Sequence, residues 1–145
     1  EGAGRMSTAP FREPIGWPLL PLPDTNGALA WPDLARSVRE QIQVLLSTQP
    51  GEQLMRPAFG AGLERLLGEP NTISTRARIR DLVIDALARW EPRITVDAVT
   101  VDPISGASGR EVSSAVRVEI AYRLVRTQAS HRLGLTLVME AGHAD

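Results

Sequence analysis

Apolar residues recur three or four positions apart in two long stretches of the chain, which is the spacing of one buried helix face. The first stretch follows Pro32 and Asp33, a favoured helix beginning, and ends at the turn-forming Pro50-Gly51. Its expected buried face consists of Leu34, Val38, Ile42 and Leu45. The second begins around Thr72 to Thr75, and its expected buried face consists of Ile79, Leu82, Val83, Ala86, Leu87 and Trp90. Between them, a short helical turn through Leu63, Leu66 and Leu67 is expected to stop at Gly68.

The period changes to two directly after Glu91-Pro92-Arg93, which predicts strands for the rest of the chain. A first strand is expected over 94–101, where a slip in parity near Ala98 indicates either a bulge or burial on both faces. Residues 102–113 have the composition of a loop. Two further alternating runs predict a hairpin about Thr127–Ser130. Its facing pairs would be Leu124 with Leu133, Tyr122 with Leu135, Ile120 with Leu137, Val118 with Met139, and Arg117 with Glu140 on the other face.

The first thirty residues have a different composition, with five prolines and several large apolar residues. Each proline lacks a backbone donor and restricts its predecessor, so a continuous helix or central strand is excluded. We therefore expect residues 1–30 to form an extended Pro-rich N-terminal arm and residues 31–145 to form one domain. The predicted class is α+β, with two main helices and a short one packed on a small, mostly antiparallel sheet. The sheet would end in a C-terminal hairpin at about 114–140.

Composition narrows the classes of partner. The chain has 145 residues, a net charge of -1 and no cysteine, and all 16 of its basic residues are arginine. This balance gives no reason to expect a nucleic-acid partner. No apolar run approaches the ~20 residues that span a bilayer, so membrane insertion is not expected. The absence of cysteine excludes disulfides and thiolate metal sites and suits a reducing cytoplasm. We see no signal-peptide pattern.

Candidate catalytic groups are few. His131 lies beside the predicted hairpin turn and His143 near the end of the chain, without the spacing of a metal site. The carboxylates of Glu64, Glu69, Asp81 and Asp85 lie among arginines on amphipathic faces, which favours surface solvation over an acid pair. The serines lack a nucleophile motif, and Gly60-Ala61-Gly62 lacks the spacing of a phosphate loop. We expect no catalytic residues, no metal, no cofactor and no enzymatic activity.

Three stretches in order carry a resemblance to a known family. They are "GWPLLPLPDTNGALA" (16–30), "LSTQPGEQLMRPAFGAGLERLL" (46–67) and "ALARWEPRITV" (86–96). Together they resemble the gpW/gp25-like baseplate wedge proteins of contractile tails, a family that includes TssE of type VI secretion and equivalents in extracellular injection particles. The family's T-x-P-G-E-R-x-M-R-P-x-F-G pattern is matched by Thr48, Pro50, Gly51, Glu52, Met55, Arg56, Pro57, Phe59 and Gly60. Its E-P-R motif is matched by Glu91, Pro92 and Arg93, whereas Gln53 replaces the usual arginine.

The resemblance implies a structural baseplate subunit of a contractile injection system, a phage-tail-like particle. Members sit around the inner tube, contact wedge subunits and offer strands to the first ring of sheath protein. It implies sheath protein and wedge subunits as partners, with inner-tube or hub proteins as further ones, in multiple copies in a sixfold ring. The chain would be cytoplasmic during assembly and then part of a particle or virion baseplate. Whether that machine is a phage tail, a secretion system or a free particle stays open.

Three sets of residues follow from this reading. The baseplate contacts are expected at Arg56, Glu91, Pro92 and Arg93. The anchors of the loop before the short helix are expected at Pro50, Gly51, Met55, Pro57, Phe59 and Gly60. The hairpin that binds sheath is expected to use Val118, Ile120, Tyr122, Leu124, Leu133, Leu135 and Leu137, within 116–125 and 132–140.

The corner, the hairpin and the role of the whole chain each have an alternative. Glu91 and Arg93 lie at a rigid corner and either face a partner or pair inside the domain, with each other or with Arg56 or Glu52. The hairpin either leaves an edge for a partner's strand or merely completes its own sheet. The chain as a whole could instead be an interaction module or anti-adaptor outside such a machine, or, with less support, a lysozyme-like hydrolase.

Overall fold

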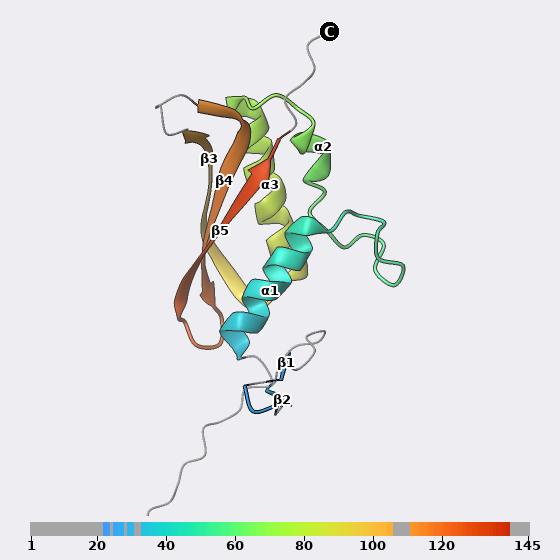
Figure 1. Cartoon of the computed structure of the whole chain (residues 1–145), viewed down its shortest axis with the longest axis vertical. Coiled ribbons are helices and arrows are strands. Elements are labelled where there is room, and N and C mark those ends of the chain that lie inside the picture. The colour runs from blue at the N-terminus through green and yellow to red at the C-terminus, as the bar shows by residue number, and fades with distance from the viewer. Residues whose placement is uncertain (1–21, 24, 28, 31–32, 106–110, 140–145) are drawn as a thin grey trace, which may run out of the picture. The chain divides into compact units, whose positions relative to one another are not determined.

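The computed structural model describes residues 22–23, 25–27, 29–30, 33–105 and 111–139 (Figure 1). Two compact units divide the chain, residues 1–37 and residues 38–145. In the first unit, β1 (Leu22–Pro23) pairs antiparallel with β2 (Leu29–Ala30), and Gly27 takes a positive φ of 76° between them. Residues 1–21, 24 and 28 of the predicted N-terminal arm lie outside the described residues.

Helix α1 (Leu34–Ser47) begins in the first unit and continues into the second. The Asp33 carboxylate accepts the Arg36 N–H at 2.8 Å, which caps the helix where the sequence predicts its start. At the other end, the Thr48 hydroxyl donates to the Val44 carbonyl at 2.6 Å. The predicted stripe is confirmed within the second unit, where Val38, Ile42 and Leu45 are fully buried.

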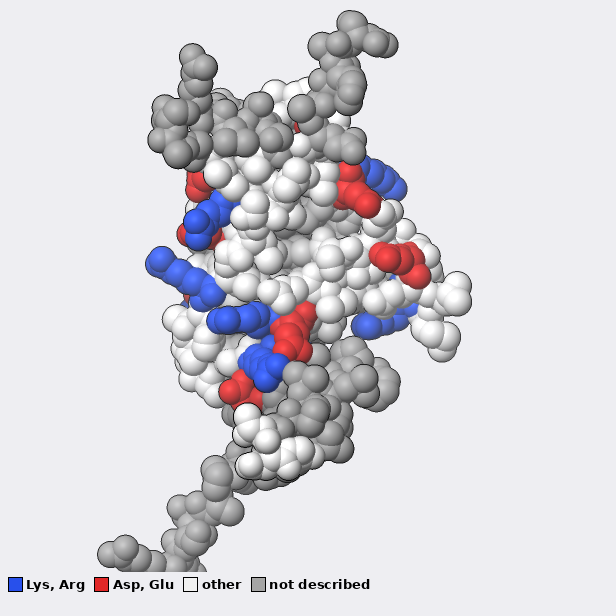
Figure 2. Space-filling model, in the orientation of Figure 1, with Lys and Arg blue, Asp and Glu red and all other residues white. Residues whose placement is uncertain are grey.

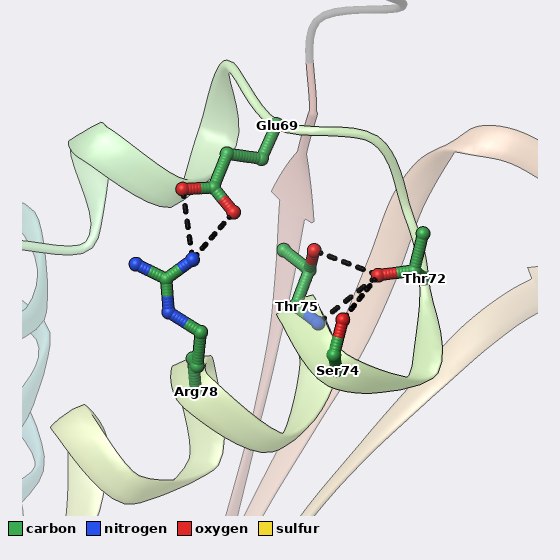
Figure 3. A network of polar contacts seen from close by, with 5 residues as sticks. All are labelled: Glu69, Thr72, Ser74, Thr75 and Arg78. Carbon is green, nitrogen blue, oxygen red and sulfur yellow. Dashed lines mark hydrogen bonds and ion pairs between the residues drawn. The ribbon is translucent and has the colours of Figure 1, made fainter.

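The short helix α2 (Glu64–Leu67) stops at Gly68, and α3 (Ile73–Trp90) follows, both as predicted. Figure 3 shows the connection between them. The Thr72 hydroxyl oxygen accepts the Thr75 N–H at 3.2 Å and lies 2.9 Å from the Ser74 and Thr75 hydroxyls. The Arg78 guanidinium meets the Glu69 carboxylate at 2.7 Å and 3.0 Å. A cap and an ion pair therefore fix the direction in which α3 starts.

The sheet consists of β3 (Ile94–Ser105), β4 (Glu111–Leu124) and β5 (Ser130–Val138), all antiparallel, with β4 in the middle. One face carries the core: β4 alternates between buried inward residues and more exposed outward ones. Helix α3 packs on the sheet, chiefly against β3. Three helices on a three-stranded antiparallel sheet make an α+β fold, as the sequence predicts.

A bulge in β3 explains the parity slip seen in the sequence. Val96 faces Tyr122 and Ala98 faces Ala121, so Asp97 is the extra residue. The insertion returns Val99 to the buried side. Of the two alternatives for the parity slip, the bulge near Ala98 is confirmed.

The predicted loop over 102–113 is too long. Residues 102–105 belong to β3 and residues 111–113 to β4, and only residues 106–110 lie outside the described part. Pro103 pairs with Val116 and is tolerated because β3 is an edge strand of this sheet.

The predicted hairpin register is wrong by four residues. Ile120 faces Leu133 instead of Leu137, and Arg117 faces Thr136 instead of Glu140. The chain turns earlier than predicted: the Leu124 N–H donates to the Ala129 carbonyl at 3.0 Å, and Gln128 adopts a φ of 58°. A shift by an even number of residues keeps each side chain on its predicted face, so the alternation could not reveal the error.

Candidate assembly interface

The corner between α3 and β3 is built around a buried ion pair. Pro92 disfavours helical geometry at Glu91, which closes α3 with φ -125° and ψ 79°. Arg93 Nε lies 2.7 Å from Glu91 Oε1, and Nη2 lies 2.8 Å from Oε2. The Arg93 N–H also donates to Oε1, at 3.2 Å. The two side chains thus form a bidentate pair within the tripeptide.

This pair supports the internal alternative for the corner. The Glu91 side chain is 1% exposed and that of Arg93 is 27% exposed, so the carboxylate cannot reach a partner. The hydrogen bond with Glu91 raises the pKa of Arg93, which stays charged. The Arg93 carbonyl accepts the Val125 N–H at 2.9 Å and ties the corner to the turn after β4. Pro92 is exposed and remains available to a partner.

The loop between α1 and α2 is pinned at its C-terminal end. Phe59 is fully buried, with its ring 5.4 Å from that of Trp90 in an edge-on arrangement. Gly60 has a φ of 124°, and a Cβ there would collide with the Thr48 carbonyl, so only glycine fits. Gly51 takes the positive φ that its turn requires, 96°. The structure therefore places Phe59, Gly60 and Gly51 where they shape the two ends of the loop.

The other predicted anchors do not reach the core. Met55 is 94% exposed, and Pro50 and Pro57 are also exposed. The prediction that Met55 anchors the loop is wrong, because the chain turns back at this point and its tip points into solvent. Arg56 is exposed as well, and its guanidinium lies 4.4 Å from the centre of the Phe59 ring.

The residues predicted to bind sheath are mostly core residues. Val118, Ile120, Tyr122, Leu124 and Leu133 are between 0% and 6% exposed, and Leu135 and Leu137 are partly buried. Because β4 is the central strand, both of its edges are already paired, and 116–125 cannot receive another strand. Of the two strands predicted to bind sheath, β5 has a free edge within the described sheet. A partner strand would bind there through backbone N–H and C=O groups and not through the predicted side chains.

The two edges of the sheet differ in regularity. β3 is interrupted by the bulge at Asp97 and by a second irregularity between Pro103 and Ile104. β5 pairs with β4 over nine consecutive residues without a shift and contains no proline. Bulges and prolines hinder the addition of a further strand, so β5 is the edge better suited to accept one.

The ladder also indicates which β5 groups point outward. The Leu124 N–H donates to Ala129, and hydrogen-bonded and non-hydrogen-bonded pairs alternate along an antiparallel ladder. Counting along β5 from Ala129, the residues Arg132, Gly134 and Thr136 therefore face β4 in non-hydrogen-bonded pairs. The backbone N–H and C=O groups of these three residues face the free edge.

Tyr122, which the sequence predicts to bind sheath, instead carries a buried hydroxyl. Tyr122 is 1% exposed, and its hydroxyl makes no hydrogen bond of good geometry in the described structure. Burial raises the pKa of Tyr122, and the nearby Arg39 guanidinium offsets part of that rise. The alternating pattern marks Tyr122 only as an inward residue and carries no signal for its neighbours.

The described residues contain no cluster of three or more histidine, cysteine or acidic side chains that could hold a metal ion. A shallow pocket of about 500 Å³ is lined by Asp97, Ala121, Tyr122, Ser130, His131 and Arg132. Its only carboxylate, on Asp97, is paired with Arg123 at 2.9 Å.

On the face shown in Figure 2, acidic and basic side chains are interspersed and form no large patch of one sign. Among the described residues, none of the helices combines the length and the apolar composition that a membrane span requires.

Comparisons with known proteins agree with this fold. The sequence model of the family described as baseplate wedge protein gp25 matches residues 32–129. Baseplate protein W of Escherichia phage P2 is 30% identical over 63 residues, which cover 43% of this chain and 55% of that protein. That alignment therefore spans only about half of the relative's length.

Solved structures share the architecture. A protein from Geobacter sulfurreducens described as a tail lysozyme superposes with a TM-score of 0.68 at 28% identity, over 79% of this chain and 98% of that one. A chain of the anti-feeding prophage baseplate superposes with a TM-score of 0.55 at 18% identity, over 86% of this chain and 83% of that one. A chain of a type VI secretion system baseplate complex superposes with a TM-score of 0.52 at 19% identity, over 74% of this chain and 95% of that one. The last two likenesses concern the fold alone.

Proposed function

Because the chain belongs to the baseplate wedge protein gp25 family, we propose that it starts sheath assembly by accepting a strand of sheath protein on the free edge of β5. It would be held in the baseplate by wedge subunits, in several copies around the inner tube. The observation that carries the proposal is the contrast between the two edges: β3 is bulged and β5 is regular. Backbone pairing along an open edge is a common way to capture an extended segment.

The sheath strand would gain its affinity from main-chain hydrogen bonds. Arg132, Gly134 and Thr136 each direct an N–H and a C=O outward, which suffices for a ladder along most of β5. The adjacent Val138 is 68% exposed and offers an apolar contact beside that ladder. The core side chains of the hairpin would support β5 from behind without touching the sheath.

We propose a structural and not an enzymatic role, although one similar structure is described as a tail lysozyme. A glycosidase needs a carboxylic acid that donates a proton in a protected site. Glu91 is the only buried carboxylate in the described part of the chain, and both its oxygens are bound by Arg93. The purified chain should leave the turbidity of a peptidoglycan suspension unchanged, and a steady fall in turbidity would overturn this view.

Replacing Thr136 by proline tests the strand-addition proposal. Proline removes one outward N–H and leaves the pairing between β4 and β5 intact, so the isolated chain should stay folded. Thr136→Val is the matched control, because it keeps the N–H in a β-branched residue. We expect the Thr136→Pro variant to join the baseplate but to produce particles without sheath, whereas Thr136→Val particles carry sheath of normal length. Normal sheath on the proline variant, seen by electron microscopy, would refute the proposal.

A further inference from the structure

Two large apolar side chains stand almost completely in solvent at the tip of the loop between α1 and α2. Leu54 is 95% exposed and Met55 is 94% exposed. Figure 1 shows this loop extending away from the helices of the second unit. Single exposed apolar residues are ordinary on protein surfaces, but two adjacent ones on a projecting loop form a distinct apolar tip.

The loop is held in shape by its own hydrogen bonds. The Gly51 N–H donates to the Pro57 carbonyl at 2.6 Å, which closes the base of the loop. The Glu52 carboxylate accepts the Gln49 N–H at 2.9 Å, and the Arg56 N–H donates to the Gln53 carbonyl at 3.2 Å. With the C-terminal end held by the buried Phe59, these contacts keep Leu54 and Met55 in solvent.

The positively charged side chain of Arg56 follows the two apolar residues in the loop. The Arg56 guanidinium lies on the Phe59 ring, and no carboxylate in the described structure pairs with it. A stacked guanidinium loses little freedom when it binds, and its planar edge suits a carboxylate. The tip therefore offers two apolar side chains followed by one oriented positive charge.

We propose that Leu54 and Met55 insert into an apolar pocket of a neighbouring baseplate subunit, with Arg56 pairing a carboxylate at the rim of that pocket. This inference rests on the proposed function, because it requires the chain to be a member of a baseplate. It assigns the wedge contact to the loop tip in place of the corner, where Glu91 is buried against Arg93. A rigid protruding side chain in a fully desolvated pocket is the usual form of an interface hot spot.

A protein pocket is favoured over a lipid surface by the charges around the tip. The segment 52–56 contains one glutamate and one arginine, so it lacks the basic excess that draws a loop to anionic lipids. Two apolar side chains alone give weak membrane binding but suffice for a strong protein contact once they are buried.

The first test measures binding of the full chain to wedge complex from the same machine, assembled without this chain. The double variant Leu54→Ser/Met55→Ser should raise Kd by about 100-fold, since each side chain contributes about tenfold or more when buried. Its melting temperature should stay within about 2 °C of the wild type, because both residues are exposed. Ile73→Ser is the matched control: Ile73 is 80% exposed at the first residue of α3 and does not belong to the loop, so its replacement should leave Kd unchanged.

The outcomes separate the two proposals. If the wild type and the double variant bind wedge complex equally well, the loop-tip inference is refuted and the baseplate role stands. If the wild type does not bind the wedge complex at all, both the loop-tip inference and the proposed baseplate role are refuted.

The second test identifies the occupant directly, by placing the photo-crosslinker p-benzoyl-phenylalanine at position 54 in assembled particles. Mass spectrometry should find the adduct on apolar residues of a wedge subunit, close to an aspartate or glutamate. An adduct on a second copy of this chain, or on added vesicles of anionic lipid, would overturn the assignment.

Discussion

Replacing Arg93 by methionine tests the view that the corner pair is internal. The change keeps most of the hydrophobic stem and removes the guanidinium that binds both Glu91 oxygens, at 2.7 Å and 2.8 Å. The Glu91 side chain is 1% exposed, so its carboxylate would be left buried without a charged partner. An uncompensated buried charge is costly because water cannot replace the lost contact.

The expected cost follows from the burial of the two partners. Removing one member of a buried ion pair destabilises a protein by about 3–5 kcal/mol. Arg93 is 27% exposed, and water reaches part of the site, so the lower end, about 3 kcal/mol, applies. For a chain of this size that corresponds to a fall in melting temperature of about 10 °C.

The same change at a surface pair provides the control. Arg123 contacts Asp97 through Nε and Nη2 at 2.9–3.1 Å, with side-chain exposures of 43% and 37%. Arg123→Met should cost at most about 1 kcal/mol, because exposed pairs contribute little. Both variants are compared with the wild type by thermal and urea unfolding of the isolated chain. If Arg93→Met melts within about 2 °C of the wild type yet loses wedge binding, the internal reading is wrong and the corner faces a partner.

Two further predictions concern the loop and the core. Gly60→Ala should lower the free energy of unfolding by about 3 kcal/mol, since a Cβ at φ 124° meets the Thr48 carbonyl. Gly68→Ala, with negative φ and open space around it, should be neutral or slightly stabilising in the same urea titration, and equal effects would contradict the argument. Tyr122→Phe should cost less than about 1 kcal/mol, because the hydroxyl it removes makes no good hydrogen bond in the described structure. Burial raises the pKa of Tyr122, so the folded wild type should lose stability as pH rises above about 10, and the phenylalanine variant should lose less. Identical alkaline denaturation curves would show that Tyr122 does not contribute.

Much of the fold could be predicted from local pattern. The helices, the short turn ending at Gly68 and the inward face of each strand follow from spacing in the sequence, and the bulge at Asp97 is one of the two explanations that the spacing allows. These features depend on residues within a few positions of one another, where sterics and periodicity act directly. The cap at Thr72 is local in the same sense.

The candidate site was predicted less completely. The sequence pointed to the loop and the corner as candidate contact sites, but it named Met55 among the loop anchors and left the partner of Arg93 open. Whether a side chain on a loop points inward depends on how the loop is closed, here by Gly51 and Pro57, and no periodicity encodes that.

The sequence by itself determined the main helices, the periodic parts of the three long strands and which face of each is apolar, because these properties have a fixed period along the chain. It did not determine the full length of β3 and β4, whose ends at 102–105 and 111–113 have the composition of a loop. Only the tertiary structure decided the register of β4 against β5, the central place of β4 and the free edge of β5. A shift by four residues leaves every side chain on the same face, so the hydrophobic pattern fits both registers equally well. The choice between them is made by the turn, where Gln128 takes a positive φ and the chain reverses before Ala129.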